Sequence, residues 1–331
     1  MVNFLCLFGD KRDTWRMSSD GYVNLGLSLP PTILTMIGNP AFFITLLKTS
    51  SLHTPSNVLL GALCVTDLLA GAICQPINMV LRIQKQERCC SPLLRTYWFM
   101  VHMSPLNSFV FSLLITLDRY IAICHPYRYI QHASCRRYVY VTFGLFGISM
   151  IYATVELRVY DYSPVTFWAL ELVLELLFIV AVFITYLRIY GVVRSQRRRI
   201  TGSSNVFVGR QSRISIRERS KTYTVGIILA IFIACYAPYI VYSIMSILYL
   251  LGDIEDYKYI FQLEISAYYL VLLNSCLNPV IYCAMSREIR RAAVKIFMPN
   301  SRFARNSVNA LGNMEINRGR RIDQSCAESE L

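Results

Sequence analysis

The stretch "ITLDRYIAICHPYRY" spans Ile115 to Tyr129 and contains an abrupt change of character. An apolar run reaches Leu117 and meets Asp118 and Arg119, after which apolar residues resume and a basic, aromatic segment follows. In the whole chain of 331 residues, 55% are hydrophobic and only 16% are charged, whereas a soluble domain has about 25% charged residues. The charged residues are too few to coat a soluble protein, so we expect this pair where an apolar helix leaves a membrane.

Seven long apolar stretches account for the shortage of charge. A membrane-spanning helix needs about 20 predominantly apolar residues. Buried helices of a soluble protein could imitate one or two such stretches, but not seven in a row. The sequence therefore predicts an all-α membrane protein with a seven-transmembrane helix bundle over residues 22–286. The predicted spans are Tyr22–Leu47, Ser56–Leu81, Thr96–Leu117, Tyr138–Val155, Tyr162–Leu187, Thr222–Leu250 and Tyr259–Ser286.

The basic residues set the expected topology. The net charge is +13, and Arg and Lys are concentrated between spans five and six and directly after span seven. By the positive-inside rule, both segments face the cytoplasm, although the loop between spans two and three also carries basic residues. We expect a multi-pass protein of the cell membrane with residues 1–21 outside, a cytoplasmic loop at 194–221 and a cytoplasmic C-terminus. The lipid bilayer, and not nucleic acid, is then the partner of the basic charge.

The segment after span seven predicts a helix on the membrane surface. Residues 287–298 place Ile289 and Phe297 on one face and basic residues on the other, the pattern of an amphipathic helix on an anionic leaflet. A solvated basic helix is the alternative. Residues 299–331 are rich in Asn, Ser and Arg and are expected to form a disordered cytoplasmic tail. Its last residues, Ser329–Leu331, fit the pattern of a PDZ-domain ligand.

A layer of polar residues is expected at one depth of the bundle. Asp67 lies eleven residues after the start of span two, about 16 Å inward at the rise of a helix, and Ser108 lies eleven residues before Arg119 at the end of span three. Such a layer either joins helices by hydrogen bonds or holds a small cation against a carboxylate. Its predicted members are Asn39, Asp67, Ser108, Asn274, Ser275 and Asn278.

Arg119 is predicted to belong to a latch at the cytoplasmic end of span three. Glu218 lies twenty residues before Pro238 in span six, about 30 Å along that helix, and so falls at the cytoplasmic end as well. Arg119 can then pair with Asp118 and reach Glu218, and breaking the pair would release span six. A plain ion pair at a helix end is the alternative.

Two prolines within spans are expected to act as hinges, because each removes a backbone hydrogen bond. Pro238 lies in span six after Phe232 and Tyr236. Pro279 lies in span seven between Asn278 and Tyr282.

With these residues in place, the chain resembles the rhodopsin-like (class A) G-protein-coupled receptors from about Gly38 to Phe297. The resemblance is carried, in chain order, by "GN" at Gly38–Asn39, "LCVTD" ending at Asp67, "DRY" at Asp118–Tyr120, "CYAP" at Cys235–Pro238 and "NPVIY" at Asn278–Tyr282.

The resemblance implies a receptor, not an enzyme, that binds an extracellular ligand and activates a heterotrimeric G protein by opening the cytoplasmic ends of spans three and six. Arrestins and receptor kinases are implied as further partners. The implied coupling residues are Asp118, Arg119, Tyr120, Glu218 and Tyr282, and the implied switch residues are Phe232, Tyr236, Pro238, Asn278 and Pro279. A seven-span transporter or channel is the alternative, although the chain has no inverted repeat.

Several positions depart from the family pattern. Tyr236 stands for the span-six Trp and Phe178 for the span-five Pro. The second outer loop, expected from Leu157 to about Tyr162, has no Cys, so the usual disulfide is absent and Cys89 or Cys90 is left to pair with Cys6. A short Cys-free second outer loop and the missing Pro are similar to the melanocortin–cannabinoid branch, whereas Asn278 differs from its melanocortin members.

The resemblance also narrows the ligand. Leu272 stands where retinal-binding members have Lys, so no retinal cofactor is expected, and sodium at Asp67 is the only expected metal ion. Val101 stands where aminergic members have Asp, which implies a non-aminergic site. Tyrosines enrich the outer half, a lining that suits a small molecule. The predicted ligand-site residues are Val101, His102, Glu171, Glu175, Tyr239, Tyr242, Tyr268 and Tyr269.

Glu171 and Glu175 lie four residues apart in span five, so they share one helix face. Two carboxylates facing lipid would be costly, so this face is expected to point inward. Either the carboxylates bond to Tyr or Ser within the bundle, or they receive a cationic or hydrogen-bond-donating group of the ligand. Glu156, near the end of span four, would add negative potential.

Overall fold

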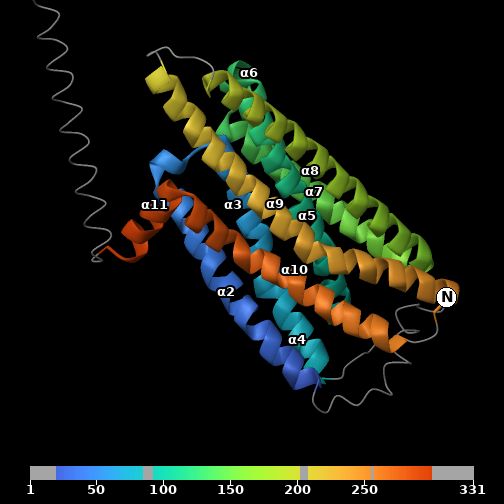
Figure 1. Cartoon of the computed structure of the whole chain (residues 1–331). Coiled ribbons are helices and arrows are strands. Elements are labelled where there is room, and N and C mark those ends of the chain that lie inside the picture. The colour runs from blue at the N-terminus through green and yellow to red at the C-terminus, as the bar shows by residue number, and fades with distance from the viewer. Residues whose placement is uncertain (1–19, 85–91, 202–207, 255–256, 300–331) are drawn as a thin grey trace, which may run out of the picture.

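Seven apolar helices form the body of the protein, as the sequence predicts. A computed structural model describes residues 20–84, 92–201, 208–254 and 257–299, and every regular element in these ranges is a helix (Figure 1). Seven of them are long and apolar enough to cross a membrane. In chain order the elements are α2 (Asp20–Lys48), η1 (Ser50–Leu52), α3 (Pro55–Leu69), η2 (Ala70–Cys74), α4 (Gln75–Gln84), α5 (Pro92–Cys124), α6 (Pro126–His132), α7 (Cys135–Tyr162), α8 (Pro164–Thr201), α9 (Val208–Leu251), α10 (Tyr257–Met285) and α11 (Arg287–Phe297).

Several predictions concern residues outside these ranges. They are the N-terminal segment up to residue 19, with Cys6, the loop at 85–91, with Cys89 and Cys90, and the tail from residue 300, with Ser329–Leu331. The pairing of these cysteines and the PDZ pattern therefore stay predictions.

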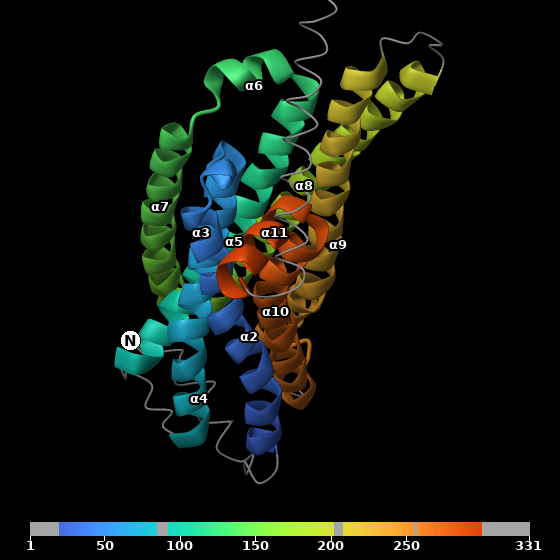
Figure 2. The same ribbon diagram turned by 90° about the vertical axis from the view of Figure 1, so that its left-hand side faces the viewer.

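The helices run side by side, with α5 at the centre of the bundle. It packs on α3, α7, α8 and α9 and is the most buried of the seven spans, whereas α7 is the least buried. One end of the bundle carries α6, the last turns of α8 and the first turns of α9 (Figure 2), and α11 lies toward the same end (Figure 1). We call this the Arg119 end, and the opposite end, with the α7–α8 and α9–α10 connections, the His102 end.

Helix ends are fixed by local chemistry. Ser286 caps α11, because its hydroxyl accepts a hydrogen bond from Ile289 N at 3.3 Å. At the end of α9, Gly252 adopts φ +88°, and the N–H groups of Gly252 and Asp253 donate to the carbonyls of Tyr249 and Leu248. This is the Schellman arrangement, which favours glycine because the left-handed conformation strains other residues. The chain thereby turns from α9 into α10.

Span two is interrupted by a π-helical turn, η2, between α3 and α4. Pro76 follows this turn and cannot donate a backbone hydrogen bond. Gly71 lies in the turn, where a Cβ would come within 2.8 Å of Thr35 on α2. The absence of a side chain lets α2 and span two approach closely here.

Several helices extend beyond the boundaries expected from the sequence; α5, for example, spans Pro92–Cys124 and not only Thr96–Leu117. The expected loop at Leu157–Tyr162 is wrong, because α7 continues to Tyr162 and only Ser163 separates it from α8. Within the segment 194–221, α8 continues to Thr201 and α9 begins at Val208. These helical turns carry charged residues, so hydrophobicity gave no sign of them.

The predicted helix after span seven is present as α11, which turns away from the direction of the bundle (Figure 1). Ile289 on its apolar face is buried, and α11 packs on α2 and α10. Arg287 and Arg291 are exposed on the other face. The segregation of apolar and basic residues therefore holds in the folded chain.

Candidate functional site

At the Arg119 end, four side chains converge around Asp118. Its Oδ2 accepts hydrogen bonds from Arg119 Nη2 at 2.7 Å and from Ser56 Oγ at 2.6 Å, and its Oδ1 accepts one from the Tyr138 hydroxyl at 2.7 Å. Asp118 is buried, and Ser56 also lies 3.2 Å from the Tyr129 hydroxyl. The carboxylate therefore joins α3, α5 and α7 and holds the guanidinium of Arg119 against its own helix. Sequence reasoning found the Asp118–Arg119 pair but missed Ser56 and Tyr138.

For the predicted coupling residues Tyr120 and Glu218, the structure describes fewer contacts. Tyr120 lies with its ring 6.0 Å from that of His125, at the start of α6. Burial raises the pKa of Tyr129, on α6, above its usual value, so its hydroxyl stays neutral beside Asp118. Glu218 lies on α9, but its side chain is outside the part of the structure that is described. Its pairing with Arg119 therefore stays a prediction.

Four of the six predicted polar-layer residues are joined by hydrogen bonds. Asn278 Nδ2 donates to Asp67 Oδ2 at 2.9 Å, and Asn39 Nδ2 donates to the carbonyl of Ser275 at 3.2 Å. These bonds connect α10 to α3 and α2. Asp67 is fully buried, and its Oδ1 has no hydrogen-bond partner among the described residues. Ser108 and Asn274 are also buried but take no part in these two bonds.

The predicted switch residues of span six belong to an aromatic cluster. Phe232 and Tyr236 are stacked with ring centroids 4.5 Å apart. Phe109, on α5, packs against both, at 5.2 and 4.6 Å. Phe178, which stands for the span-five Pro, lies 4.7 Å from Phe109 and 5.6 Å from Phe232. The cluster therefore joins α5, α8 and α9 within the two turns that precede Pro238. The sequence had indicated neither Phe109 nor the role of Phe178 in packing.

Span seven places its hinge residues beside buried partners. Pro279 lies within α10, directly after Asn278, which bonds to Asp67. Tyr282 is buried, and its ring lies 5.2 Å from that of Phe42 on α2. The hydroxyl of Tyr282 has no hydrogen-bond partner in the described residues, so it is available to a partner that a shift of α10 would bring within reach.

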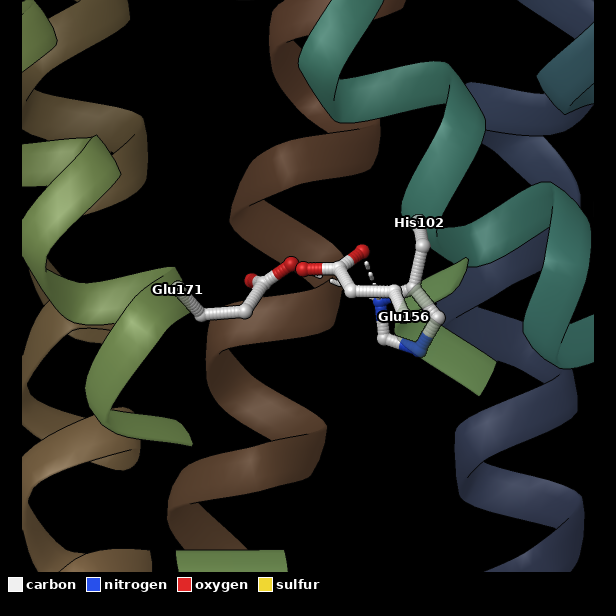
Figure 3. Close-up of side chains that lie close together, drawn as sticks. All are labelled: His102, Glu156 and Glu171. Carbon is white, nitrogen blue, oxygen red and sulfur yellow. Dashed lines mark ion pairs between the residues drawn. The ribbon is translucent and has the colours of Figure 1, made fainter. Parts of the chain in front are cut away.

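Toward the His102 end, three ionisable side chains from three helices meet. His102 Nδ1, on α5, lies 3.8 Å from Glu156 Oε2 on α7 and 3.5 Å from Glu171 Oε1 on α8. Figure 3 shows both carboxylates reaching toward the imidazole. A further carboxylate, Glu175, is buried one turn along α8. As their spacing predicts, Glu171 and Glu175 point inward and not toward lipid.

Among the residues that the structure describes, His102 is the one basic side chain that forms an ion pair with this acidic group. Among the described residues, no Lys or Arg forms an ion pair with Glu156, Glu171 or Glu175. Glu156 accepts a very short hydrogen bond from the Tyr152 hydroxyl through Oε1. Its Oε2 and Glu175 Oε2 are buried without a hydrogen-bond partner. This part of the bundle thus combines three buried or partly buried carboxyl groups with unused acceptor atoms.

Aromatic rings surround the His102 ring. Trp98 stacks on it with centroids 5.7 Å apart, and Phe167 meets it edge-on at 4.9 Å. Of the predicted ligand-site tyrosines, Tyr242 lies 5.1 Å from Trp168, which in turn packs on Phe167. Tyr239 lies 5.8 Å from Tyr242, and Tyr268 lies 6.3 Å from Tyr269. Val101 precedes His102 on α5 and is partly buried.

The contact between Glu156 and His102 could not be predicted from the sequence. An acidic residue at the end of an apolar span, such as Glu156, indicates a functional residue or one with a partner inside the bundle. The sequence does not reveal how each helix is rotated about its axis. Tyr152 and Trp98 were therefore not identified either. Both follow only from the rotation of α7 and α5 in the bundle.

Comparisons with known proteins agree with this arrangement. The model of the seven-transmembrane receptors of the rhodopsin family matches residues 38–282, well over half of the chain. The chain is similar to trace amine-associated receptor 1 of Mus musculus, with 26% identity over 80% of this chain and 86% of that protein. It is similar to sphingosine 1-phosphate receptor 1 of Danio rerio, with 28% identity over 82% and 78% of the two chains. It also resembles the histamine H2 receptor of Cavia porcellus, with 25% identity over 80% and 76%.

Proposed function

This chain belongs to the rhodopsin family of seven-transmembrane receptors and is a G-protein-coupled receptor, and on that premise we propose that its ligand is a cation received by Glu171 and Glu175. The family makes the chain a receptor and not an enzyme, and it does not favour the transporter or channel. The three groups of relatives differ, so the similarity to the melanocortin–cannabinoid branch stays a prediction.

The observation that carries the proposal is the buried acidic group at the His102 end. Glu156 and Glu171 face one imidazole, Glu175 is buried one turn along α8, and no described Lys or Arg forms an ion pair with any of the three. Burying carboxylates without compensating charge is costly. A ligand ammonium group would supply both the charge and the hydrogen-bond donors that these carboxylates lack.

The proposed site differs from the usual aminergic one in the helix that holds the acid. Val101 occupies the span-three position where aminergic members have Asp. Here the carboxylates come from α8, with Glu156 of α7 next to them. The names of two relatives, the trace amine-associated and histamine receptors, refer to amines and support a cationic ligand. The sphingosine 1-phosphate receptor names a phosphate, which the negative potential here disfavours.

The orientation follows from the same proposal. The His102 end would face the outside, where the ligand arrives, and the Arg119 end would face the cytoplasm and the G protein. The basic residues of the segment 194–221 and of α11 lie toward the Arg119 end and support this orientation by the positive-inside rule. Arrestins and receptor kinases would act at the same face.

A screen of charge-matched ligands tests the proposal. Cells that express the receptor with a promiscuous G protein are exposed to arylalkylamines, their neutral alcohol analogues and the corresponding carboxylic acids. We expect activation by amines and not by acids. Glu171→Gln and Glu175→Gln should each raise the half-maximal concentration at least tenfold, about 1.4 kcal/mol.

The matched control is Asp253→Asn, which removes an exposed carboxylate in the α9–α10 connection at the same end of the bundle. It should leave amine potency unchanged. An agonist that proves to be an acid, or unchanged potency in both Glu variants at equal surface expression, contradicts the proposal.

A further inference from the structure

We propose that His102, Glu156 and Glu171 form a binding site for a divalent transition-metal ion, for which Zn²⁺ is the best match. The three donor atoms come from α5, α7 and α8 and all lie within 4.8 Å of one another. Figure 3 shows the two carboxylates and the imidazole gathered between the helices. This goes beyond ligand recognition, because the site needs no agonist to be occupied.

The separations of the donors agree with tetrahedral zinc. Bonds of about 2.0–2.2 Å to imidazole nitrogen and carboxylate oxygen place two ligand atoms about 3.3–3.6 Å apart in such a site. His102 Nδ1 lies 3.5 Å from Glu171 Oε1 and 3.8 Å from Glu156 Oε2. Small rotations of the side chains are therefore enough to bring all three donors within bonding distance of one ion.

The types of donor select the metal. Imidazole nitrogen and carboxylate oxygen are both donors that zinc accepts. Imidazole suits zinc, copper and nickel, whereas calcium requires six to eight oxygen ligands and magnesium keeps much of its water. A neutral imidazole with two carboxylates carries two negative charges, which balance those of a divalent cation. The site is therefore selective against the abundant Mg²⁺ and Ca²⁺.

Unused polar atoms point independently to a ligand here. His102 and Glu156 are both at least nine-tenths buried, with 4% and 3% exposure. His102 Nδ1 and Glu156 Oε2 have no hydrogen-bond partner among the described residues, although each faces the cluster. A buried acceptor without a partner destabilises the folded protein. A metal ion between the three donors would satisfy both atoms.

Neighbouring groups already hold the ligands in orientation. Tyr152 donates its hydroxyl to Oε1 of Glu156, which leaves Oε2 for the ion. Trp98 and Phe167 enclose the His102 ring by stacking and edge contact. Groups that orient the ligands in this way raise metal affinity and are typical of metal-binding sites in proteins.

Occupancy of the site would also regulate the receptor. Three protein donors leave the fourth tetrahedral position open to water or to a ligand group. The ion would bind Glu171, which the proposed amine site also uses, and its positive charge would repel an ammonium group. Zn²⁺ should therefore lower amine potency, and this part of the inference rests on the proposed function.

Direct metal binding tests the site without any agonist. The full-length receptor in lipid nanodiscs is titrated with Zn²⁺, and affinity is read from bound radioactive zinc and from the rise in Tm. We expect saturable binding of one ion and a rise in Tm, with no comparable rise in Mg²⁺ or Ca²⁺. His102→Asn and Glu156→Gln should each weaken binding at least tenfold, whereas Glu175→Gln and Asp253→Asn should retain it.

Cobalt provides a second measurement that does not depend on the variants folding. Co²⁺ bound in place of Zn²⁺ should give the intense visible absorption of a four-coordinate site, and added Zn²⁺ should abolish it. Absence of a saturable Zn²⁺ site in the parent receptor overturns the proposal, as does undiminished binding in folded His102→Asn and Glu156→Gln. Failure of the amine proposal would appear separately, because Glu175→Gln would then bind zinc and also keep full agonist potency.

Discussion

Asp67 is a fully buried carboxylate in the middle of the bundle. One carboxylate oxygen accepts a hydrogen bond from Asn278, and the other has no hydrogen-bond partner among the described residues. A carboxylate at this depth needs a counter-charge or a proton. We propose, in agreement with the family resemblance, that a sodium ion bound at Asp67 stabilises the resting state.

Agonist affinity should therefore depend on sodium. Replacing choline chloride with sodium chloride should weaken agonist binding at least about fivefold, a usual size for such coupling, and Asp67→Asn should abolish the difference. Radioligand competition in the two salts measures it. Thr66→Val is the control, since the Thr66 hydroxyl bonds to Ala62 of its own helix and should leave the sodium effect intact. Equal agonist affinity in both salts for the parent receptor would exclude this role.

At the scale of the helices, we propose that a movement of α9 changes the state of the receptor. Above its Arg119 end, Phe232 and Tyr236 pack against α5 and α8. Closer to that end, Gly226 faces Tyr186 of α8, and a Cβ at Gly226 would lie 2.8 Å from the Tyr186 Cε2. Glycine here therefore leaves room for the Tyr186 side chain, and Pro238 is the proposed hinge about which α9 would move.

Gly226→Ala should force Tyr186 and α9 apart. Alanine normally stabilises a helix relative to glycine by up to about 1 kcal/mol, so a fall in stability would isolate the clash. We expect Gly226→Ala to lower the Tm of the purified receptor by at least about 2 °C. Gly191→Ala on α8 is the matched control, because nothing lies within 4 Å of its added Cβ. A Gly226→Ala receptor as stable as Gly191→Ala would show that the contact is not restrictive.

The sequence was sufficient to predict the number and order of the membrane-spanning helices. It did not predict where these helices end or the short helices η1 and α6. The length of an apolar stretch identifies a span, because a helix in lipid must be apolar over the thickness of the membrane. The turns of α8 and α9 that extend beyond the apolar stretch are charged, so hydrophobicity does not predict that they are helical. The segment after Glu156 resembled a loop because it contains Arg158 and Asp161. In the structure Glu156 is buried against His102, and the helix continues to Tyr162.

Depth along a helix could be counted from the sequence, whereas direction around its axis could not. Counting predicted that Asp67 and Asn278 share a level, and they form a hydrogen bond. The Ser56 and Tyr138 contacts to Asp118 depend on how α3 and α7 are rotated, which no single sequence specifies. The pairing of His102 with Glu156 was missed for the same reason.

In the whole molecule, α5 connects the two ends. His102 and Arg119 are seventeen residues apart on this helix, about 25 Å at 1.5 Å per residue. Phe109 lies between them and touches Tyr236 and Phe232 of α9. A ligand that draws α8 and α5 together at the acidic group would act on this aromatic cluster and, through α9, on the Arg119 end. Such coupling requires a two-state element, and α9 with its hinge at Pro238 is the candidate.

Agonist-stimulated nucleotide exchange on a purified heterotrimeric G protein, with the receptor in lipid nanodiscs, tests this account most directly. We expect an amine to stimulate exchange in the parent receptor. The Glu175→Gln variant should need at least about tenfold more amine to reach the same maximal rate. Arg119→Ala should still bind the amine but produce no stimulation, and Asp253→Asn should match the parent. Equal amine potency in Glu175→Gln and the parent, or full stimulation by Arg119→Ala, would contradict the account.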